Sequence, residues 1–260
     1  MIPKKIHYCW FGGNPKSKVV KKCINSWKKI CSGYEIIEWN ESNFNISTAP
    51  LYVRQAYKAK KWAYVTDYVR LYVVHEYGGI YLDTDVQVIK CFDGFLHYNA
   101  FFGFENTTNI ATGLGFGAVK GLNILCEIMN QYSKIPFALK NGYVDMTPCP
   151  QRNTDVFLNY GLKQNGETQL LDDNIIVLAT EYLCPIDYET LQLNKTKNTI
   201  SIHWFNASWM SSDGKKHHIK QARHRRRVNN KHIFIHFPNK ILKKIVGNDK
   251  YNALKQILKK

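Results

Sequence analysis

Two carboxylates, Asp83 and Asp85, stand two residues apart at the end of the apolar run Ile80-Tyr81-Leu82. On a strand, residues i and i+2 point to the same face, so this spacing predicts that both carboxylates project together from a strand end. Such a pair suits Mg²⁺ or Mn²⁺, which complete their coordination with phosphate oxygens. The alternative is a solvated turn, because D-x-D also occurs by chance.

A second pair of charged residues precedes the first. Asp67 and Arg70 lie three residues apart in a segment rich in Tyr and Val, and on a helix this spacing puts them on one face. A polar pair in such a segment is either a structural ion pair or part of a site. The predicted helix stops at Gly78-Gly79, just before the strand that leads to Asp83.

Several elements must position these side chains. A strand over 4–10, an amphipathic helix over 17–31 and a strand over 34–39 form a β-α-β order, which favours a parallel α/β sheet. The rest of the chain predicts a helix over 50–77, strands within 86–119, a helix over 121–132, an irregular stretch with three prolines over 133–154, and strands over 175–178 and 199–203.

The charge is unevenly distributed. Of the formal net charge of +16, residues 1–213 carry +2 and residues 214–260 carry +14, with Asp249 as the single acid of the second segment. We therefore predict a near-neutral globular domain over 1–213 and a basic C-terminal helical extension over 214–260. With 45% hydrophobic and 22% charged residues, the chain can bury a core, which excludes global disorder.

Cysteines and hydropathy bear on location. The seven cysteines are scattered and never spaced as C-x-x-C, which argues against a disulfide framework and a zinc site and fits a reducing cytosol. The sequence has no run of about 18 apolar residues and no signal-peptide pattern, so we expect a cytoplasmic protein.

The extension suggests a partner. Apolar residues alternate with lysines over 241–260, a pattern typical of segments that bind an anionic membrane surface from its cytoplasmic, inner side. Packing of these apolar residues against the domain is an equally weighted alternative. Nucleic acid is less favoured, because no helix-turn-helix or aromatic RNA-binding signature accompanies the charge.

The run AYVTDYVRLYVVHEYGGIYLDTDV over 63–86 resembles a family of D-x-D glycosyltransferases. That family includes outer-chain mannosyltransferases and bacterial capsule and lipopolysaccharide enzymes, and the glucosylating clostridial toxins are more distantly similar. Segments 2–13, 113–121 and 203–209 resemble further parts of it. The resemblance implies a GT-A type fold over 1–213: one nucleotide-sugar-binding α/β domain with a mixed, mainly parallel sheet and helical additions.

The resemblance also implies roles for individual residues. Asp83, Asp85 and His203 would hold Mn²⁺ or Mg²⁺, with Asn206 or Ser208 as alternatives to His203. Asp67, Arg70 and Asp85 would be the catalytic residues. The donor would be bound by Trp10, which stacks on the base, and by Asp67, Arg70, Tyr81, Asp83, Ser208 and Trp209.

The implied function is a metal-dependent, retaining hexosyltransferase. It would transfer a sugar from a nucleotide diphosphate, expected to be UDP, to a glycan or lipid-linked glycan in surface polysaccharide synthesis. No carboxylate nucleophile is evident from the sequence, so we hypothesise a front-face substitution.

Two alternatives remain at this stage. One is a haloacid-dehalogenase-like phosphatase that uses Asp172-Asp173, although Gln87 stands where that motif wants Thr or Val. The other is a basic nucleic-acid- or membrane-binding protein whose D-x-D is structural. The G-x-G-x-x-A pattern of Gly113–Ala118 is set aside as a dinucleotide site, because no strand ending in an acid follows it.

Overall fold

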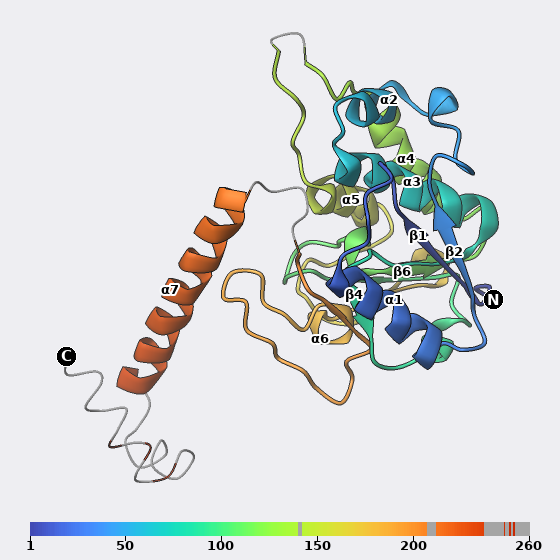
Figure 1. Cartoon of the computed structure of the whole chain (residues 1–260). Coiled ribbons are helices and arrows are strands. Elements are labelled where there is room, and N and C mark those ends of the chain that lie inside the picture. The colour runs from blue at the N-terminus through green and yellow to red at the C-terminus, as the bar shows by residue number, and fades with distance from the viewer. Residues whose placement is uncertain (140–141, 207–211, 237–246, 248–249, 251, 253–260) are drawn as a thin grey trace. The chain divides into compact units, whose positions relative to one another are not determined.

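The computed structural model describes residues 1–139, 142–206 and 212–236, together with residues 247, 250 and 252 (Figure 1). The chain divides into two compact units. The α/β unit comprises Met1–Ile186 and Leu193–Trp209, and the second unit comprises Asp187–Gln192 and Met210–Lys260.

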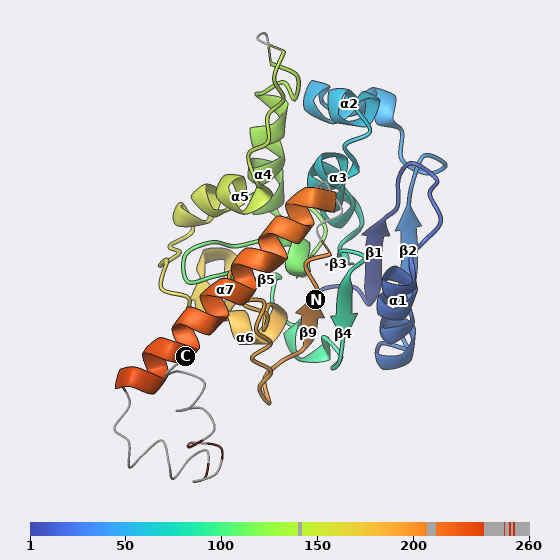
Figure 2. The same cartoon turned by 60° about the vertical axis from the view of Figure 1, so that its left-hand side comes forward.

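A seven-stranded sheet forms the centre of the α/β unit (Figures 1 and 2). Five of its strands run in one direction, and β6 and β7 run against their neighbours. The spatial order is β2 (Glu35–Trp39), β1 (Lys5–Cys9), β3 (Gly79–Tyr81), β6 (Phe116–Ala118), β5 (Ala100–Gly103), β8 (Ile175–Leu178) and β7 (Gln169–Leu171). The predicted α/β class with a mixed, mainly parallel sheet is confirmed.

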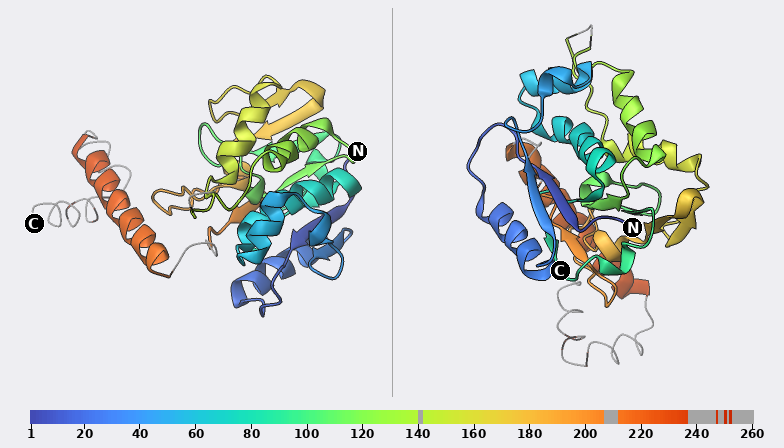
Figure 3. Two further views of the ribbon diagram at one scale, coloured as in Figure 1. Left: turned by 90° about the horizontal axis from the view of Figure 1, so that it is seen from above. Right: turned by 90° about the vertical axis from the view of Figure 1, so that its right-hand side faces the viewer.

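Alternation along the strands divides the core into two clusters. In β1 and β5, Ile6 and Phe101 pack into the cluster that contains α1 (Lys18–Ile30), whereas Cys9 and Phe102 pack into the other. Successive strand residues point to opposite faces, so each strand serves both clusters. The sheet is therefore covered on both sides by helices, as the two views of Figure 3 also show.

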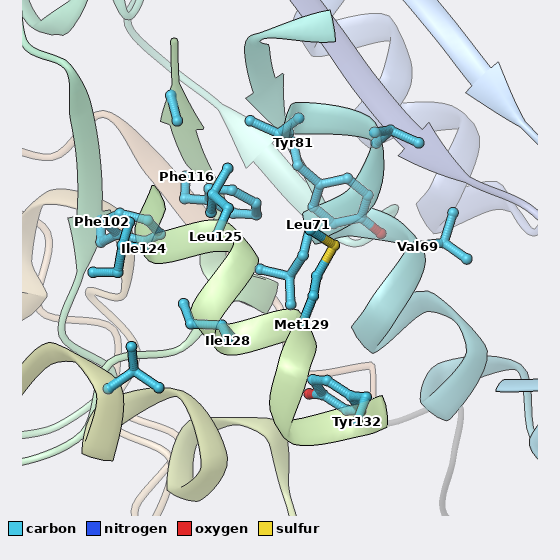
Figure 4. Packing of buried hydrophobic residues seen from close by; sticks show 14 of the residues in the cluster. Val69, Leu71, Tyr81, Phe102, Phe116, Ile124, Leu125, Ile128, Met129 and Tyr132 are labelled. Carbon is cyan, nitrogen blue, oxygen red and sulfur yellow. The ribbon is translucent and has the colours of Figure 1, made fainter. Parts of the chain in front are cut away.

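The second cluster is built by helices that follow the first βαβ unit. They are α2 (Leu51–Lys58), α3 (Trp62–Tyr77), α4 (Asn123–Ser133) and α5 (Cys149–Leu158). Figure 4 shows how Ile124, Leu125 and Ile128 of α4 lie against Phe102 and Phe116 of the sheet. Phe102 and Phe116 stack with ring centroids 5.2 Å apart, which ties β5 and β6 together under the helix.

A two-stranded antiparallel sheet lies outside the main one. It pairs β4 (Val86–Val88) with β9 (Ser201–His203), two segments more than a hundred residues apart in the chain (Figure 2). In this register Val86 lies opposite His203. The pairing therefore brings the C-terminal part of the α/β unit next to the residues that follow β3.

The single helix predicted over 50–77 is two separate helices in the structure, α2 and α3. The pattern over 50–77 is interrupted after α2, where Lys60 adopts φ 55°. The amide of Lys61 donates to the carbonyl of Ala56, and the amide of Lys60 donates to that of Tyr57. These two bonds form a Schellman motif, which ends a helix. The prediction was wrong here because that position usually holds glycine, whereas this chain uses lysine.

The stretch over 133–154 was predicted to be irregular, but α5 begins within it. Pro150 lies in the first turn of α5, where a missing amide N–H costs nothing because that group has no partner inside the helix. The sequence prediction also missed the short elements β7 and α6 (Thr180–Leu183). Short 3-10 turns occur at Ile46–Thr48, Asp93–Phe95, Thr112–Leu114 and Asp172–Asn174.

In the second unit the described residues include a long helix, α7 (Ser212–His236). The segment Asp187–Gln192 packs on it: the rings of Tyr188 and His218 stack at 4.4 Å, and Arg225 lies 3.8 Å from Glu189. Within the described part of the chain, no helix combines the length and the apolar composition needed to span a membrane.

A buried histidine connects the first strands. His7 is fully buried and lies 2.8 Å through Nε2 from the carbonyl oxygen of Gly78, while Trp39 Nε1 donates to His7 Nδ1 over 3.0 Å. Since Nδ1 accepts a hydrogen bond, the proton resides on Nε2 and the ring is neutral. Burial lowers the pKa of His7 below its ordinary value of 6.5.

We predict that His7 makes the protein less stable in mild acid. As the pH falls below about 6.5, His7 becomes protonated in the unfolded chain but stays neutral in the folded protein, because its folded pKa is lower. The free energy of unfolding therefore decreases until the pH reaches the folded pKa of His7. Between pH 7.5 and 5.5, the free energy of unfolding should fall by roughly 1 kcal/mol more in the wild type than in His7→Gln. Urea unfolding at both pH values measures this difference. If the free energy of unfolding fell equally in the wild type and in His7→Gln, His7 would not be the buried neutral group described above.

Candidate functional site

The two aspartates of the D-x-D pattern lie in a turn rather than on a strand. β3 ends at Tyr81 and β4 begins at Val86, and the amide of Val86 donates to the carbonyl of Asp83 over 2.9 Å. The predicted strand geometry is therefore wrong. A four-residue turn nevertheless brings one side-chain oxygen of Asp83, one of Asp85 and a ring nitrogen of His203 within 4.8 Å of one another.

Asp83 is held from the sheet and from α3. The hydroxyl of Tyr81 donates to Asp83 Oδ1 over 2.9 Å, and Arg70 Nη1 lies 3.6 Å from Asp83 Oδ2. Tyr81 itself is buried and also lies beneath the guanidinium, whose carbon is 5.4 Å from the ring centroid. Tyr81 therefore reaches the site through its hydroxyl and orients both Asp83 and Arg70.

Asp67 and Arg70 form an ion pair, as their spacing on α3 predicts. Arg70 Nη2 donates to Asp67 Oδ1, and Arg70 Nε donates to the carbonyl of Thr66 over 3.1 Å. Both side chains are buried. The pair adjoins Asp83, so Arg70 bridges a helix carboxylate and a D-x-D carboxylate.

A glycine leaves room for this bridge. A Cβ atom on Gly113 would lie 2.7 Å from Asp83 Oδ2 and 3.0 Å from Arg70 Nη1. Gly115 has φ +108°, a conformation that side chains rarely adopt. Gly113 and Gly115 thus allow this segment to approach the site closely, and the segment continues into β6 rather than directly into a helix.

Asp85 is held by β9 and the residues after it. His203 Nε2 lies 3.2 Å from Asp85 Oδ1, and the amide of Asn206 donates to Asp85 Oδ2 over 2.7 Å. The amide of Trp204 donates to the backbone carbonyl of Asp85 over 3.1 Å. His203, the residue chosen from the sequence, thus lies beside Asp85, while Asn206 contacts it through its backbone.

The charges of the site act on one another. Burial raises the pKa of Asp83, and raises that of Asp67 to about 6, although the charge of Arg70 opposes both shifts. Burial acts on Asp85 as well, but the charge and hydrogen bond of His203 outweigh it and lower the pKa of Asp85 to about 2. Burial alone would lower the pKa of His203, and Asp85 raises it instead.

Glu105 is an acidic residue of this region that the sequence prediction missed. It follows β5, whose carboxyl end lies at the same sheet edge as that of β3, because the two strands run in the same direction. Burial raises the pKa of Glu105, and the charge of His203 opposes this rise. The available signal was an acid directly after the apolar run AFFGF, the same pattern that precedes Asp83.

The donor set fits a divalent cation. Four carboxylates, those of Asp67, Asp83, Asp85 and Glu105, interact with Arg70 and His203. Asp67 also interacts with the charge of Arg152, which is itself paired with Asp145. His203 Nδ1 is buried and has no hydrogen-bond partner among the described residues. Carboxylate oxygens and imidazole nitrogen suit Mn²⁺, and carboxylates suit Mg²⁺, so Asp83, Asp85 and His203 could hold either ion.

The remaining predicted residues are less closely tied to this cluster. Trp10 follows β1 at the same sheet edge and is half-buried; its Nε1 donates to the carbonyl of Asn14 over 2.7 Å, and Lys16 Nζ lies 5.4 Å from the ring centroid. Ser208 and Trp209 lie outside the described residues. Their predicted role in donor binding stays a prediction.

The phosphatase alternative does not fit the topology. Asp172 and Asp173 precede β8, which runs in the same direction as β3, so they lie at the amino edge of the sheet. The backbone carbonyl of Asp173 accepts a hydrogen bond from Asn99, just before β5 begins. Asp83 follows the carboxyl end of β3 and therefore lies at the opposite edge.

Comparison with known proteins points to one family. Residues 17–102 match the family of the glycosyltransferase sugar-binding region containing DXD motif. Over 142 residues the chain is 28% identical to inositol phosphoceramide mannosyltransferase 3 of Schizosaccharomyces pombe. This alignment spans 52% of the chain and only 38% of the length of that relative.

Solved structures that align with this chain include two glycosyltransferases. The PaToxG glycosyltransferase aligns with a TM-score of 0.48 and 20% identity over 61% of this chain and 68% of its own. A glycosyltransferase involved in glycosylation of the major capsid of PBCV-1 aligns with a TM-score of 0.44 and 15% identity. This alignment covers 83% of the present chain and 98% of that glycosyltransferase.

The family match contains Asp67, Arg70, Asp83 and Asp85, which the structure brings together, whereas His203 lies beyond it. Residues 17–102 therefore carry the DXD-containing sugar-binding region that is typical of this glycosyltransferase family.

Proposed function

We propose that this protein is a metal-dependent, retaining hexosyltransferase that takes its sugar from a UDP-sugar. The observation that carries the proposal is the carboxylate-imidazole cluster of Asp83, Asp85 and His203 directly beside the buried Asp67–Arg70 pair. This arrangement combines a cation site with a polar pair that can grip a sugar. Both are needed when a sugar leaves a nucleotide diphosphate.

The residues divide the chemistry between them. A Mn²⁺ or Mg²⁺ ion held by Asp83, Asp85 and His203 would supply Lewis-acid stabilisation of the diphosphate leaving group. Arg70 keeps Asp67 and Asp83 oriented and compensates their charge. Asp67 would accept a hydrogen bond from a sugar hydroxyl or stabilise positive charge at the anomeric carbon. Trp10, at the same sheet edge, would stack on the base.

The acceptor is proposed to be a lipid-linked glycan in surface polysaccharide synthesis. Two similarities support this part of the proposal. The run over 63–86 resembles bacterial capsule and lipopolysaccharide enzymes, and the curated relative is by its name a mannosyltransferase acting on inositol phosphoceramide. A front-face substitution remains the proposed mechanism by which the anomeric configuration of the sugar is retained.

We expect Asp85→Asn to abolish Mn²⁺-dependent binding of UDP and to lower sugar transfer at least about 100-fold, because the variant loses a charged ligand. Asparagine can still accept the hydrogen bond from the Asn206 amide, so the fold should persist. Calorimetric titration of UDP with and without Mn²⁺ measures the effect. Asp172→Asn, which removes the same charge at the opposite sheet edge, is the matched control, and equal behaviour of the two variants would refute the metal assignment.

Because Trp10 is assigned to the base and Asp67 to the sugar, substitutions of these two residues should affect UDP affinity and sugar transfer differently. Trp10→Ala should weaken UDP and UDP-sugar equally, by about tenfold, because stacking on a base contributes on the order of 1–3 kcal/mol. Asp67→Asn should leave UDP affinity within about threefold while transfer falls at least about tenfold. Separate titrations with UDP and UDP-sugar, alongside transfer rates, test this. If Asp67→Asn weakened UDP as much as Trp10→Ala, the assignment of Asp67 to the sugar would be wrong.

Glu105 is expected to act on the sugar or the acceptor rather than on the metal. We predict that Glu105→Gln lowers transfer by at least about tenfold while Mn²⁺-dependent UDP binding stays unchanged. Glu167→Gln, an exposed acid-to-amide change, serves as the control. Loss of Mn²⁺ binding in Glu105→Gln would instead make Glu105 part of the cation site.

A further inference from the structure

One face of α7 carries an unusual row of cations. Lys216, Lys220, Arg223 and Arg227 are all exposed and follow one another at intervals of four, three and four residues. At 3.6 residues per turn, this spacing keeps all four within an arc of about 60°. The row extends over about 16 Å along the helix, at 1.5 Å per residue. We refer to these four residues as the cationic stripe.

The contacts of α7 place its packed face on the other side. Ala222 is buried, the ring of His218 stacks on Tyr188, and Arg225 lies near Glu189. These residues lie roughly 180° around the helix from the cationic stripe. The segment Asp187–Gln192 therefore occupies one face of α7 and leaves the stripe on the face turned away from that segment.

The charges of the stripe are almost uncompensated. Only Lys216 has an acidic neighbour among the described residues, Asp213 at 3.4 Å, and both of these side chains are highly exposed. Such a surface pair contributes little. Lys220, Arg223 and Arg227 have no salt-bridge partner in the described ranges. Like charges in a row repel one another, and an anionic surface lying against the stripe would relieve this repulsion.

We propose that the cationic stripe is an attachment surface for anionic phospholipid membranes. A straight row of four cations on one helix face can contact a flat sheet of phosphate headgroups with all four side chains at once. Ile219, which is 40% exposed, lies next to the stripe and can enter the headgroup region.

Nucleic acid is a poorer match for this face. Residues 213–228 contain no Phe, Trp or Tyr, the side chains on which single-stranded bases stack. An apolar residue such as Ile219 also gains little against a phosphate backbone. The structure thus assigns the attraction predicted for residues 214–260 to a defined face of α7.

The test compares two variants of the full chain that each lose four positive charges. The stripe variant carries Lys216→Gln, Lys220→Gln, Arg223→Gln and Arg227→Gln. The control carries Lys21→Gln, Lys22→Gln, Lys28→Gln and Lys29→Gln, four exposed positions of α1. Glutamine has a helix propensity close to that of lysine and arginine, and circular dichroism of both variants verifies that the helices persist.

Sedimentation with vesicles of phosphatidylcholine, with and without roughly 30% phosphatidylglycerol, measures attachment. The wild type and the control should bind the anionic vesicles at low salt and release them as salt shortens the Debye length. The stripe variant should bind on the order of 100-fold more weakly. Because the readout is lipid binding, its outcome is independent of sugar transfer.

Three outcomes would overturn the proposal. The stripe variant could bind anionic vesicles as well as the control does, which would assign the attraction to net charge. The wild type could remain in the supernatant at low salt. Finally, the wild type could ignore vesicles but bind RNA or duplex DNA in a stripe-dependent way, which would make nucleic acid the partner.

Discussion

The candidate site depends on one buried guanidinium. Arg70 contacts Asp67 on its own helix and Asp83 in the turn after β3, and it lies over the ring of Tyr81. Without its charge, two partly buried carboxylates would face each other uncompensated, which is strongly unfavourable. Because α3, β3 and the Gly113 segment all converge on Arg70, this ion-pair network also fixes how helix, sheet and loop approach one another.

A second constraint is the antiparallel pairing of β4 with β9. It places His203 opposite Val86, one residue beyond Asp85, so an imidazole joins two carboxylates that are distant from it in the sequence. The amides of Trp204 and Asn206 then bind Asp85 directly. The turn of the D-x-D pattern is thus held from both sides, by Arg70 and Tyr81 at Asp83 and by β9 at Asp85.

The sheet explains why the site forms where it does. β1, β3 and β5 run in the same direction, and Trp10, Asp83 and Glu105 follow their carboxyl ends. Ligands of open α/β sheets bind at this edge. The two core clusters hold the strands from both faces, so the polar residues at the edge are carried by rigid elements, which favours precise placement of their side chains.

The sequence by itself determined the α/β class, the first βαβ unit and the pairing of Asp67 with Arg70, because hydrophobic periodicity and short-range spacing are local properties. It also singled out Asp83 and Asp85 through their spacing after an apolar run, and His203 through family resemblance. It missed the helix break at Lys60 and the start of α5 at Cys149, where a lysine adopts a glycine-like conformation and a proline begins a helix. Only the tertiary structure decided that Asp83 and Asp85 lie in a turn and that Glu105 follows a strand at the same edge. Those facts depend on strand order and on contacts between distant segments, which no local pattern records.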